Sequence, residues 1–336
     1  MNMPFTRPSC LSAAPLSRML GALLLAFTAL FAVGAQAAYP DKPIQVIISF
    51  PSAGATDILA RAIGQKLSES LGQPVVVENR PGAGGHIGLA IAAKAAPDGY
   101  TLYLAAVSNA AIAAAAYSHP AAHLVRDFVP VAGVATVPHM LVVPAALPAQ
   151  NVTQLISLIK RQPGQHNFAS QGPGTLSHLE SELFKSAAGL DMVHVPYKGS
   201  SQALPDLMAG RSSMMFDSIP ASMPHVKSGR LRVLAVASGK RLGMLPDVPT
   251  VDESGLKGFQ ADNLFGFAAP RGTPPAIIAI LARAIQGALA SSELQQRMEA
   301  QGVELRYSAP DEFGRLVEQE FRTWGKAVET AKVKLD

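Results

Sequence analysis

The sequence is short of cysteine, of charge and of aromatic residues. It has 336 residues with one cysteine, 15% charged residues and 6% aromatic residues. A single cysteine, Cys10, excludes an intramolecular disulfide and a multi-cysteine metal site. Cys10 also falls in a leader that we expect to be removed, so the mature chain has no thiol for catalysis.

Sequence motifs of catalysis are missing as well. There is no Gly-x-Ser-x-Gly elbow and no P-loop lysine, and Ile87 stands where the dinucleotide fingerprint of residues 82–88 needs its third glycine. Ser177 and His178 lie side by side on one expected helix, a poor geometry for a nucleophile and its base. We therefore expect no enzyme, no cofactor and no metal site. The net charge of +4 comes without a basic stripe, so we also expect no nucleic-acid partner.

The first 37 residues have the pattern of a signal peptide. Arg7 and Arg18 precede an apolar run over residues 19–33, and residues 35–37 read Ala-Gln-Ala, a small-x-small cleavage site. The apolar run is shorter than the roughly 20 residues that a membrane-spanning helix needs. We expect export to the periplasm with cleavage near Ala37. The alternative is a retained N-terminal anchor.

From residue 38 onward, strand-like and helix-like stretches alternate, which favours an α/β fold with a mainly parallel sheet. Strands are expected at residues 44–50, 75–78, 100–106, 129–143, 166–170, 192–195, 213–217, 231–238 and 265–270. Helices are expected after residue 57, at 87–96, from 108, and at 151–161, 176–188, 201–209, 221–228, 275–291 and 311–332. Pro130 and Pro138 interrupt the strand at 129–143, and the last two helices are expected to fold back over the first part of the chain.

The order of these elements fits two lobes joined by two crossovers. The chain leaves the first lobe near residues 141–144 and returns near residues 262–266. Lobe 1 is then residues 38–140 plus 263–336, and lobe 2 is residues 141–262. Ligands of such sheets bind beyond the carboxyl ends of the strands, so strand-to-helix turns of both lobes would face one cleft.

One of these turns, residues 50–57, carries the most information. It has small residues and two hydroxyl groups, and it leads into a helix on which Leu59, Ile63 and Leu67 share a face. Backbone N–H groups at a helix start, together with the helix dipole, can hold a carboxylate or a phosphate without an arginine. The alternative is an ordinary loop in which Thr56 or Asp57 caps the helix.

Further candidates lie in other turns, each with a structural alternative. Ser108 and Asn109 follow the third strand, and Thr175 and Ser177 follow the strand at 166–170; all four could instead cap helices. Tyr197 could stack on a ligand or be a half-buried hinge aromatic. Asp217 ends an apolar strand. It would attract an ammonium or hydroxyl group if it faces the cleft, and otherwise it starts a turn.

Several motifs occur together in one order along the chain. They occupy residues 39–44, 50–57, 72–85, 96–102, 174–179, 195–199, 215–217 and 245–250. In this order the chain closely resembles the substrate-binding proteins of tripartite tricarboxylate transporters, the Bug family. The resemblance implies a periplasmic solute-binding protein with a two-lobe fold of type II-like architecture, which closes on its ligand like a Venus flytrap. Family ligands are mostly small carboxylic acids, including di- and tricarboxylates, acidic amino acids and aromatic acids.

The resemblance also implies which residues bind the ligand. The family's binding loops correspond to residues 52–57 and 170–177 here, and we expect their N–H groups to hold one carboxylate from two sides. The expected ligand-binding residues are Ser52, Ala53, Gly54, Ala55, Thr56, Asp57, Ser108, Asn109, Ser170, Gly172, Gly174, Thr175, Ser177, Tyr197 and Asp217.

The chain departs from the family pattern in the first of these loops. The family usually has a glycine where Ala53 stands, and a left-handed conformation would cost Ala53 about 1–2 kcal/mol. Either the turn differs slightly, or this position never needs a positive φ. The hydroxyl of Ser52 could bond the ligand or face solvent.

The expected function is capture of a small carboxylate for a tripartite tricarboxylate-type transporter. The partners would be that ligand and membrane permease subunits, with the receptor itself a monomer. The alternative is a ligand sensor that docks on the ectodomain of a two-component sensor kinase.

Overall fold

The computed structural model describes residues 1, 3–5 and 39–335. Most of the predicted signal peptide, including Cys10 and the cleavage site near Ala37, lies outside the described residues. The chain divides into two units, Met1–Asp41 and Lys42–Asp336, and the second unit holds all of the helices and strands described below.

The elements before the middle of the chain alternate as predicted. They are β1 (Ile44–Ile48), α2 (Ala55–Leu71), β2 (Val75–Asn79), η1 (Ala83–Gly85), α3 (His86–Ala93), β3 (Thr101–Ala106), α4 (Val107–Ala116), α5 (Leu124–Asp127), β4 (Phe128–Pro144), α6 (Val152–Arg161) and β5 (His166–Ser170). The short helix α5 was not predicted.

The second half continues the alternation and ends in helices. Its elements are α7 (Leu176–Ala188), β6 (Met192–Pro196), α8 (Ser200–Met208), β7 (Met214–Ser218), α9 (Ile219–Lys227), β8 (Leu231–Val236), β9 (Asp262–Pro270), α10 (Pro275–Leu289), α11 (Ser292–Glu299), β10 (Glu304–Ser308) and α12 (Pro310–Ala331). Two of them, α11 and β10, were not predicted. Helix α11 begins directly after the predicted helix at 275–291, because the Ser291 side chain accepts a hydrogen bond from Leu294 N and caps a new helix.

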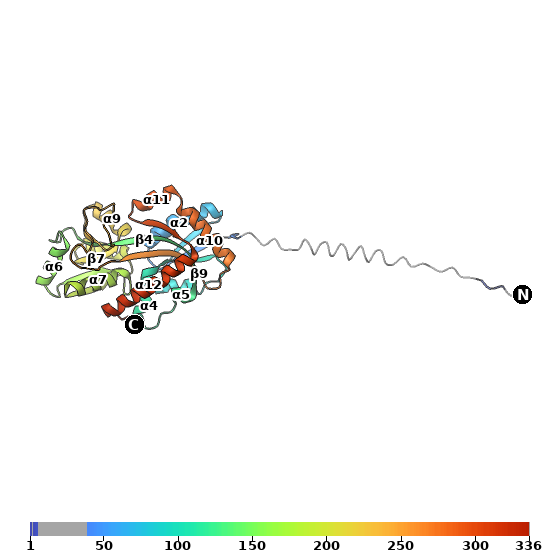
Figure 1. The fold of residues 1–336 in the computed structure, drawn as a ribbon, viewed down its shortest axis with the longest axis horizontal. Coiled ribbons are helices and arrows are strands. Elements are labelled where there is room, and N and C mark those ends of the chain that lie inside the picture. Colours follow the sequence, from blue (N-terminus) through green and yellow to red (C-terminus); the bar gives the residue numbers. More distant parts are fainter. Residues whose placement is uncertain (2, 6–38, 336) are drawn as a thin grey trace. The chain divides into compact units, whose positions relative to one another are not determined.

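The strands form one sheet path in the order β2-β1-β3-β9-β4-β7-β5-β6. At one end β1 pairs in parallel with β2 and β3, and at the other β5 pairs in parallel with β6 and β7. We call these two ends the β1 lobe and the β5 lobe. In Figure 1, α2 and α10 lie near the β1 lobe, and α6, α7 and α9 lie around the β5 lobe. The α/β prediction and the two-lobe prediction are confirmed.

Strand β4 connects the two lobes and is longer than predicted. Its first part, up to Pro138, pairs with β9, and its last part, from His139, pairs with β7 and β8. The prolines do not break it. The register against β9 shifts after Pro130, and Pro138 stands where the partner strand changes, so neither position needs an uninterrupted ladder. The edge of the polar pocket described below lies at this change of partner.

Helix α12 packs against both lobes, whereas the sequence suggested the first one only. Its Trp324 and Val328 lie in one buried cluster with Ile112 of α4 and with Leu179 and Phe184 of α7. This packing places the C-terminal helix across the junction, beside α4 (Figure 1).

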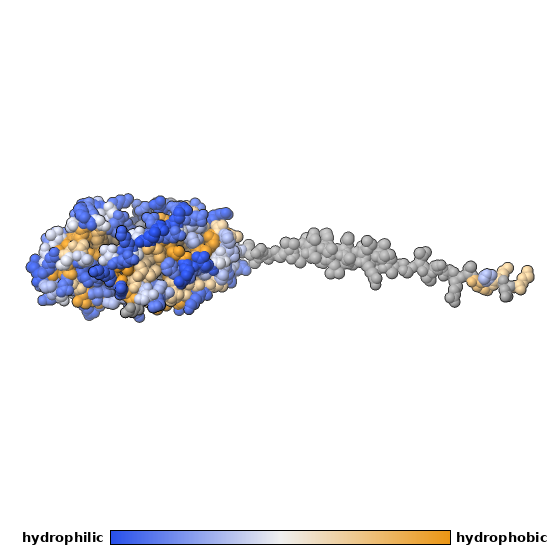
Figure 2. Space-filling model, turned by 60° about the horizontal axis from the view of Figure 1, so that its bottom comes forward, coloured by the Kyte–Doolittle hydropathy of each residue, from blue (hydrophilic) through white to orange (hydrophobic). Residues whose placement is uncertain are grey.

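None of the described helices is by itself long and apolar enough to cross a membrane; α10 and α11 pass that test only as a pair bent by 68°. On the face of Lys42–Asp336 seen in Figure 2, hydrophobic residues are interspersed with hydrophilic ones.

Candidate functional site

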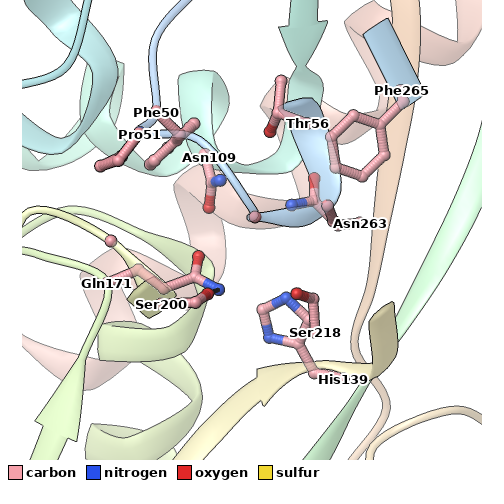
Figure 3. A pocket seen from close by; sticks show the side chains of 13 residues that line it. Phe50, Pro51, Thr56, Asn109, His139, Gln171, Ser200, Ser218, Asn263 and Phe265 are labelled. Atoms are coloured by element: carbon pink, nitrogen blue, oxygen red, sulfur yellow. Dashed lines mark hydrogen bonds between the residues drawn. The ribbon is translucent and has the colours of Figure 1, made fainter. Parts of the chain in front are cut away.

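A small polar pocket lies where the two lobes meet. It is lined by Phe50, Pro51, Gly54, Ala55, Thr56, Asn109, His139, Gln171, Gly199, Ser200, Ser218, Asn263 and Phe265. In Figure 3, Thr56 and Asn109 face His139 and Ser218 across the pocket, with Gln171 and Ser200 on one flank and Asn263 on the other. The cavity is about 20 Å³, room for about one water molecule, so the two sides lie close together.

Three helices begin at this pocket without a side-chain cap. The N-cap residues of α2, α8 and α9 are Gly54, Gly199 and Ser218, and none of these three makes a side-chain cap hydrogen bond. All three line the pocket. The first N–H groups of a helix have no partner within the helix and carry the positive end of its dipole. Three such ends at one point favour an anion.

The turn before α2 has a strained backbone. Ala53 adopts φ +66°, so the chain keeps the left-handed conformation although the family glycine is missing. The expectation that this position never needs a positive φ is therefore wrong. Ala53 N donates to Asp57 Oδ2 at 3.1 Å, which ties the turn to the first turn of the helix.

Asp57 belongs to the framework of this turn and does not line the pocket. Its Oδ1 accepts hydrogen bonds from Arg61 and Asn79, both at 2.9 Å. Burial raises the pKa of Asp57, but these hydrogen bonds, together with that from Ala53 N, outweigh burial and leave the pKa below its usual value. Ser52, beside Ala53, is exposed and also lies outside the lining. The pocket-facing part of the predicted loop is residues 54–56.

The turn before α7 uses its backbone groups internally. Thr175 caps the helix, since its Oγ1 accepts from His178 N and donates to Gly172 O at 2.7 Å. Gly172 N donates to Ser170 Oγ at 3.1 Å, and Gly174 N points to His178 Nδ1 at 3.4 Å. The predicted N–H donors of residues 172–175 are thus engaged in this conformation, and the lining residue from this turn is Gln171.

Contacts across the junction hold the two lobes together. Leu176 N donates to Asn109 Oδ1 at 2.7 Å, joining α7 to α4. Gly84 approaches Pro173 so closely that a Cβ on Gly84 would lie 2.2 Å from the proline carbonyl oxygen.

Three predicted side chains bond elsewhere in this structure. Ser108 Oγ donates to the Asp262 carbonyl and to Glu320, and Ser177 Oγ donates to the Phe216 carbonyl. The Tyr197 hydroxyl, on a half-buried ring, donates to Asp206 Oδ2 at 2.7 Å. Ser108 and Ser177 do not cap helices here, since the N-caps of α4 and α7 are Ala106 and Thr175, whereas Tyr197 is the half-buried aromatic of its structural alternative.

Asp217 lies behind the pocket wall, fully buried. It accepts hydrogen bonds from Ser200 Oγ at 2.6 Å, Gln171 Nε2 at 2.7 Å and Ser222 Oγ. Because Ser200 and Gln171 line the pocket, Asp217 fixes the direction of two side chains that a ligand would meet.

Comparison with known proteins identifies the family. Residues 59–333 match the family described as tripartite tricarboxylate transporter family receptor. The chain belongs to this family. The protein BugT of Bordetella pertussis is 40% identical to this receptor over 299 residues, which cover 88% of this chain and 91% of BugT.

Two solved structures with ligands resemble the receptor closely. Rpa4515 of R. palustris with adipate has a TM-score of 0.85 and 35% identity, covering 88% of this chain and 99% of that one. MatC of Rhodopseudomonas palustris with bound malate has a TM-score of 0.82 and 32% identity, covering 86% and 100%. The resemblance stated from the sequence is confirmed.

Sequence reasoning missed most of the polar lining of this receptor. His139 lies inside an apolar strand, and its partner Glu180 is 41 positions away, so nothing local marks it. Ser218 directly follows the predicted Asp217, and Gln171 lies between the predicted Ser170 and Gly172. Gly199 ends a motif that was noted for its resemblance only, and Ser200 directly follows that motif. Ser218, Gln171, Gly199 and Ser200 all lie at or just beyond strand ends, where ligands of such sheets bind, so this rule pointed to them.

A second recess adjoins the pocket and shares Phe50 and Asn109 with it. Its other walls are mostly apolar: Gly84, Gly85, His86, Leu89, Tyr103, Ala106, Ala110 and Ala113. The receptor thus offers polar groups on one side of Asn109 and an apolar surface on the other.

Proposed function

We propose that this receptor captures a small dicarboxylate in the pocket between its lobes and delivers it to the permease of a tripartite tricarboxylate-type transporter. The observation that carries the proposal is the convergence of the uncapped starts of α2, α8 and α9 on one pocket. The ligands of the two similar structures, adipate and malate, are both dicarboxylates.

One carboxylate would bind at the start of α2. Gly54, Ala55 and Thr56 line the pocket there, and their N–H groups and the hydroxyl of Thr56 would be the donors. A hydrogen bond to a charged group contributes about 1.5–3 kcal/mol, so two or three of them, less the ordering of the lobes, support micromolar binding. The mostly apolar residues beside Phe50 offer a surface that the carbon chain of the ligand would contact.

Ligand entry requires the lobes to separate, because the cavity of about 20 Å³ holds about one water molecule. We propose residues 38–140 plus 263–336 and residues 141–262 as the two moving lobes. Their boundaries then fall beside His139 on β4 and Asn263 on β9, two residues of the pocket lining.

Receptors of this family act in the periplasm. We propose that residues 1–37 are a signal peptide removed near Ala37, and that the mature receptor works as a monomer without catalytic activity. Its neighbours are solute-binding proteins, and the polar groups of the pocket suit binding.

Isothermal titration calorimetry tests this function. The receptor, refolded from denaturant to remove bound ligand, is titrated at pH 7 with succinate, malate and adipate, with butyrate as the monocarboxylate control. We expect saturable micromolar binding of at least one dicarboxylate and much weaker binding of butyrate. Absence of saturable binding by all three dicarboxylates rejects the proposed ligand class.

A further inference from the structure

His139 lies at the point where β4 changes partner between the lobes. Pro138 pairs with Asp262 of β9, and the next residue, His139, pairs with Ser218 of β7. The His139 side chain is only 1% exposed, yet its ring lines the pocket. In Figure 3 it faces Thr56 and Asn109 across the pocket, so an imidazole stands opposite the start of α2.

Glu180 of α7 holds this ring in place. Its Oε2 lies 2.6 Å from His139 Nδ1, and the Glu180 side chain is 0% exposed. Since Nδ1 is taken by Glu180, Nε2 is the ring nitrogen left for a ligand. A buried carboxylate and a buried imidazole are tolerated when the interaction between them offsets the cost of burying each group.

The groups around the ring favour its protonated form. Acidic side chains face His139 from three elements: Glu180 on α7, Asp217 on β7 and Asp262 on β9. Burial lowers the pKa of His139, but the charge of Glu180, its hydrogen bond to the ring, and the charges of Asp217 and Asp262 outweigh burial and raise the pKa above its usual value. Burial also raises the pKa of Glu180, against the opposing charge and hydrogen bond of His139. A protonated ring donates through both nitrogens.

The same wall of the pocket carries two buried polar atoms without a partner among the described residues. Ser218 Oγ and Asn263 Oδ1 lack hydrogen bonds, and each residue is 3% exposed. Both residues line the pocket with His139. Buried polar atoms are normally satisfied, so this wall is built to bond something that is absent from the chain itself.

We propose that His139 is the second anchor of the ligand and that Glu180 is its positioning residue. This rests on the proposed function. The start of α2 holds one carboxylate, and His139 Nε2–H donates to the oxygen at the other end of the ligand, next to Ser218 and Asn263. In this proposal the ring carries a proton on both nitrogens, with Nδ1–H donating to Glu180, so the ligand binds the receptor with His139 protonated.

This arrangement makes affinity depend on pH in one direction. Raising the pH removes the proton from His139 in the free receptor, and ligand binding must then restore it. Above the pKa of His139, we expect the dissociation constant to rise by up to about tenfold per pH unit, the limit for one linked proton. Below that pKa the dissociation constant is flat.

The test measures dissociation constants for malate and adipate by calorimetry at pH 6, 7, 8 and 9. His139→Gln should weaken binding about tenfold or more at pH 6 and flatten the pH profile. Glu180→Gln keeps the shape of the pair but removes a negative charge that stabilises the protonated ring. The dissociation constant should therefore begin to rise at a lower pH than in wild type. His119→Gln is the matched control, because His119 is exposed and lies outside the pocket, and it should behave as wild type.

Wild-type measurements alone also decide the matter if the variants fold poorly. Titrations in buffers of different ionisation enthalpy should show uptake of up to about one proton per ligand near the pKa. Wild-type binding that is independent of pH, without proton uptake, overturns the role of His139. A pH profile that persists in His139→Gln also overturns it and assigns the proton to Asp262 or Glu180. Failure of wild type to bind at any pH rejects the proposed function and this inference with it.

Discussion

The turn before α2 and the turn before α7 both connect a parallel strand to a helix at the junction of the lobes. One of the differences between them is the N-cap residue, Gly54 in the first turn and Thr175 in the second. Thr175 accepts a hydrogen bond from His178 N and so satisfies the start of α7, whereas Gly54 has no side chain to do the same for α2. A helix start is open to a ligand only when its own cap leaves the N–H groups unpaired.

The comparison bears on which helix starts lie opposite α2 in the proposed carboxylate site. The sequence pattern paired residues 52–57 with residues 170–177. The uncapped starts that actually face α2 belong to α8 and α9, at Gly199 and Ser218. The residues from before α7 contribute through Gln171, which Asp217 orients. Helix starts without a side-chain cap, and not glycine-rich turns, identify the polar side of the pocket.

The largest expected effect comes from giving α2 a cap. Gly54 has φ −88°, and a Cβ there would meet only Pro51 O at 3.7 Å, so the backbone and the Cβ of Gly54→Asp fit without strain. The new carboxylate would accept the N–H groups that we assign to the ligand and would repel it. Loss of two charge-assisted hydrogen bonds, about 3 kcal/mol, corresponds to about 100-fold weaker dicarboxylate binding by calorimetry.

The control for this variant is Gly54→Ala, which adds a Cβ without a capping group. We expect its affinity to stay within about threefold of wild type, while the helix start loses up to about 1 kcal/mol of stability. Equal affinity losses in both variants would mean that space, and not the open N–H groups, matters at this position.

The opposite change removes the cap of α7. Thr175→Ala should lower the free energy of unfolding by about 1 kcal/mol, the usual value of a lost N-cap. Affinity should change little, because the threonine bonds are internal. Urea unfolding and calorimetry measure the two quantities, and Thr175→Ser, which keeps the hydroxyl, is the control. Strongly weakened binding with unchanged stability would restore residues 172–175 as ligand donors.

The fold followed from local patterns better than the site did. Alternating apolar stretches placed most helices and strands, because periodicity depends on neighbouring residues. Pro130 and Pro138 misled only because a change of register and a change of partner strand accommodate them. The wall of the pocket depends on contacts between distant positions, such as His139 with Glu180 and Ser200 with Asp217, and no window of sequence contains both members.

Ala53 shows a further limit of prediction from sequence. Its departure from the family glycine was visible in the sequence, but its backbone conformation was not. In the structure the exposed Ala53 keeps φ +66°, and its N–H is bonded to Asp57. The turn before α2 is thus held in shape by a neighbouring carboxylate at the expense of strain, whereas the positive-φ positions of the turn before α7, Gly172 and Gly174, are glycines.

The smallest expected effect tests this strain. Ala53→Gly relieves about 1–2 kcal/mol of left-handed strain and loses about 0.5–1 kcal/mol through the greater freedom of glycine in the unfolded chain. We expect the free energy of unfolding in urea to rise by about 0.5–1 kcal/mol, with dicarboxylate affinity unchanged because Ala53 N bonds Asp57. Ala53→Val, with a branched Cβ, should lower the free energy of unfolding. A glycine variant less stable than wild type would show that Ala53 is not strained, and a change in affinity would bring its N–H group back into the ligand site.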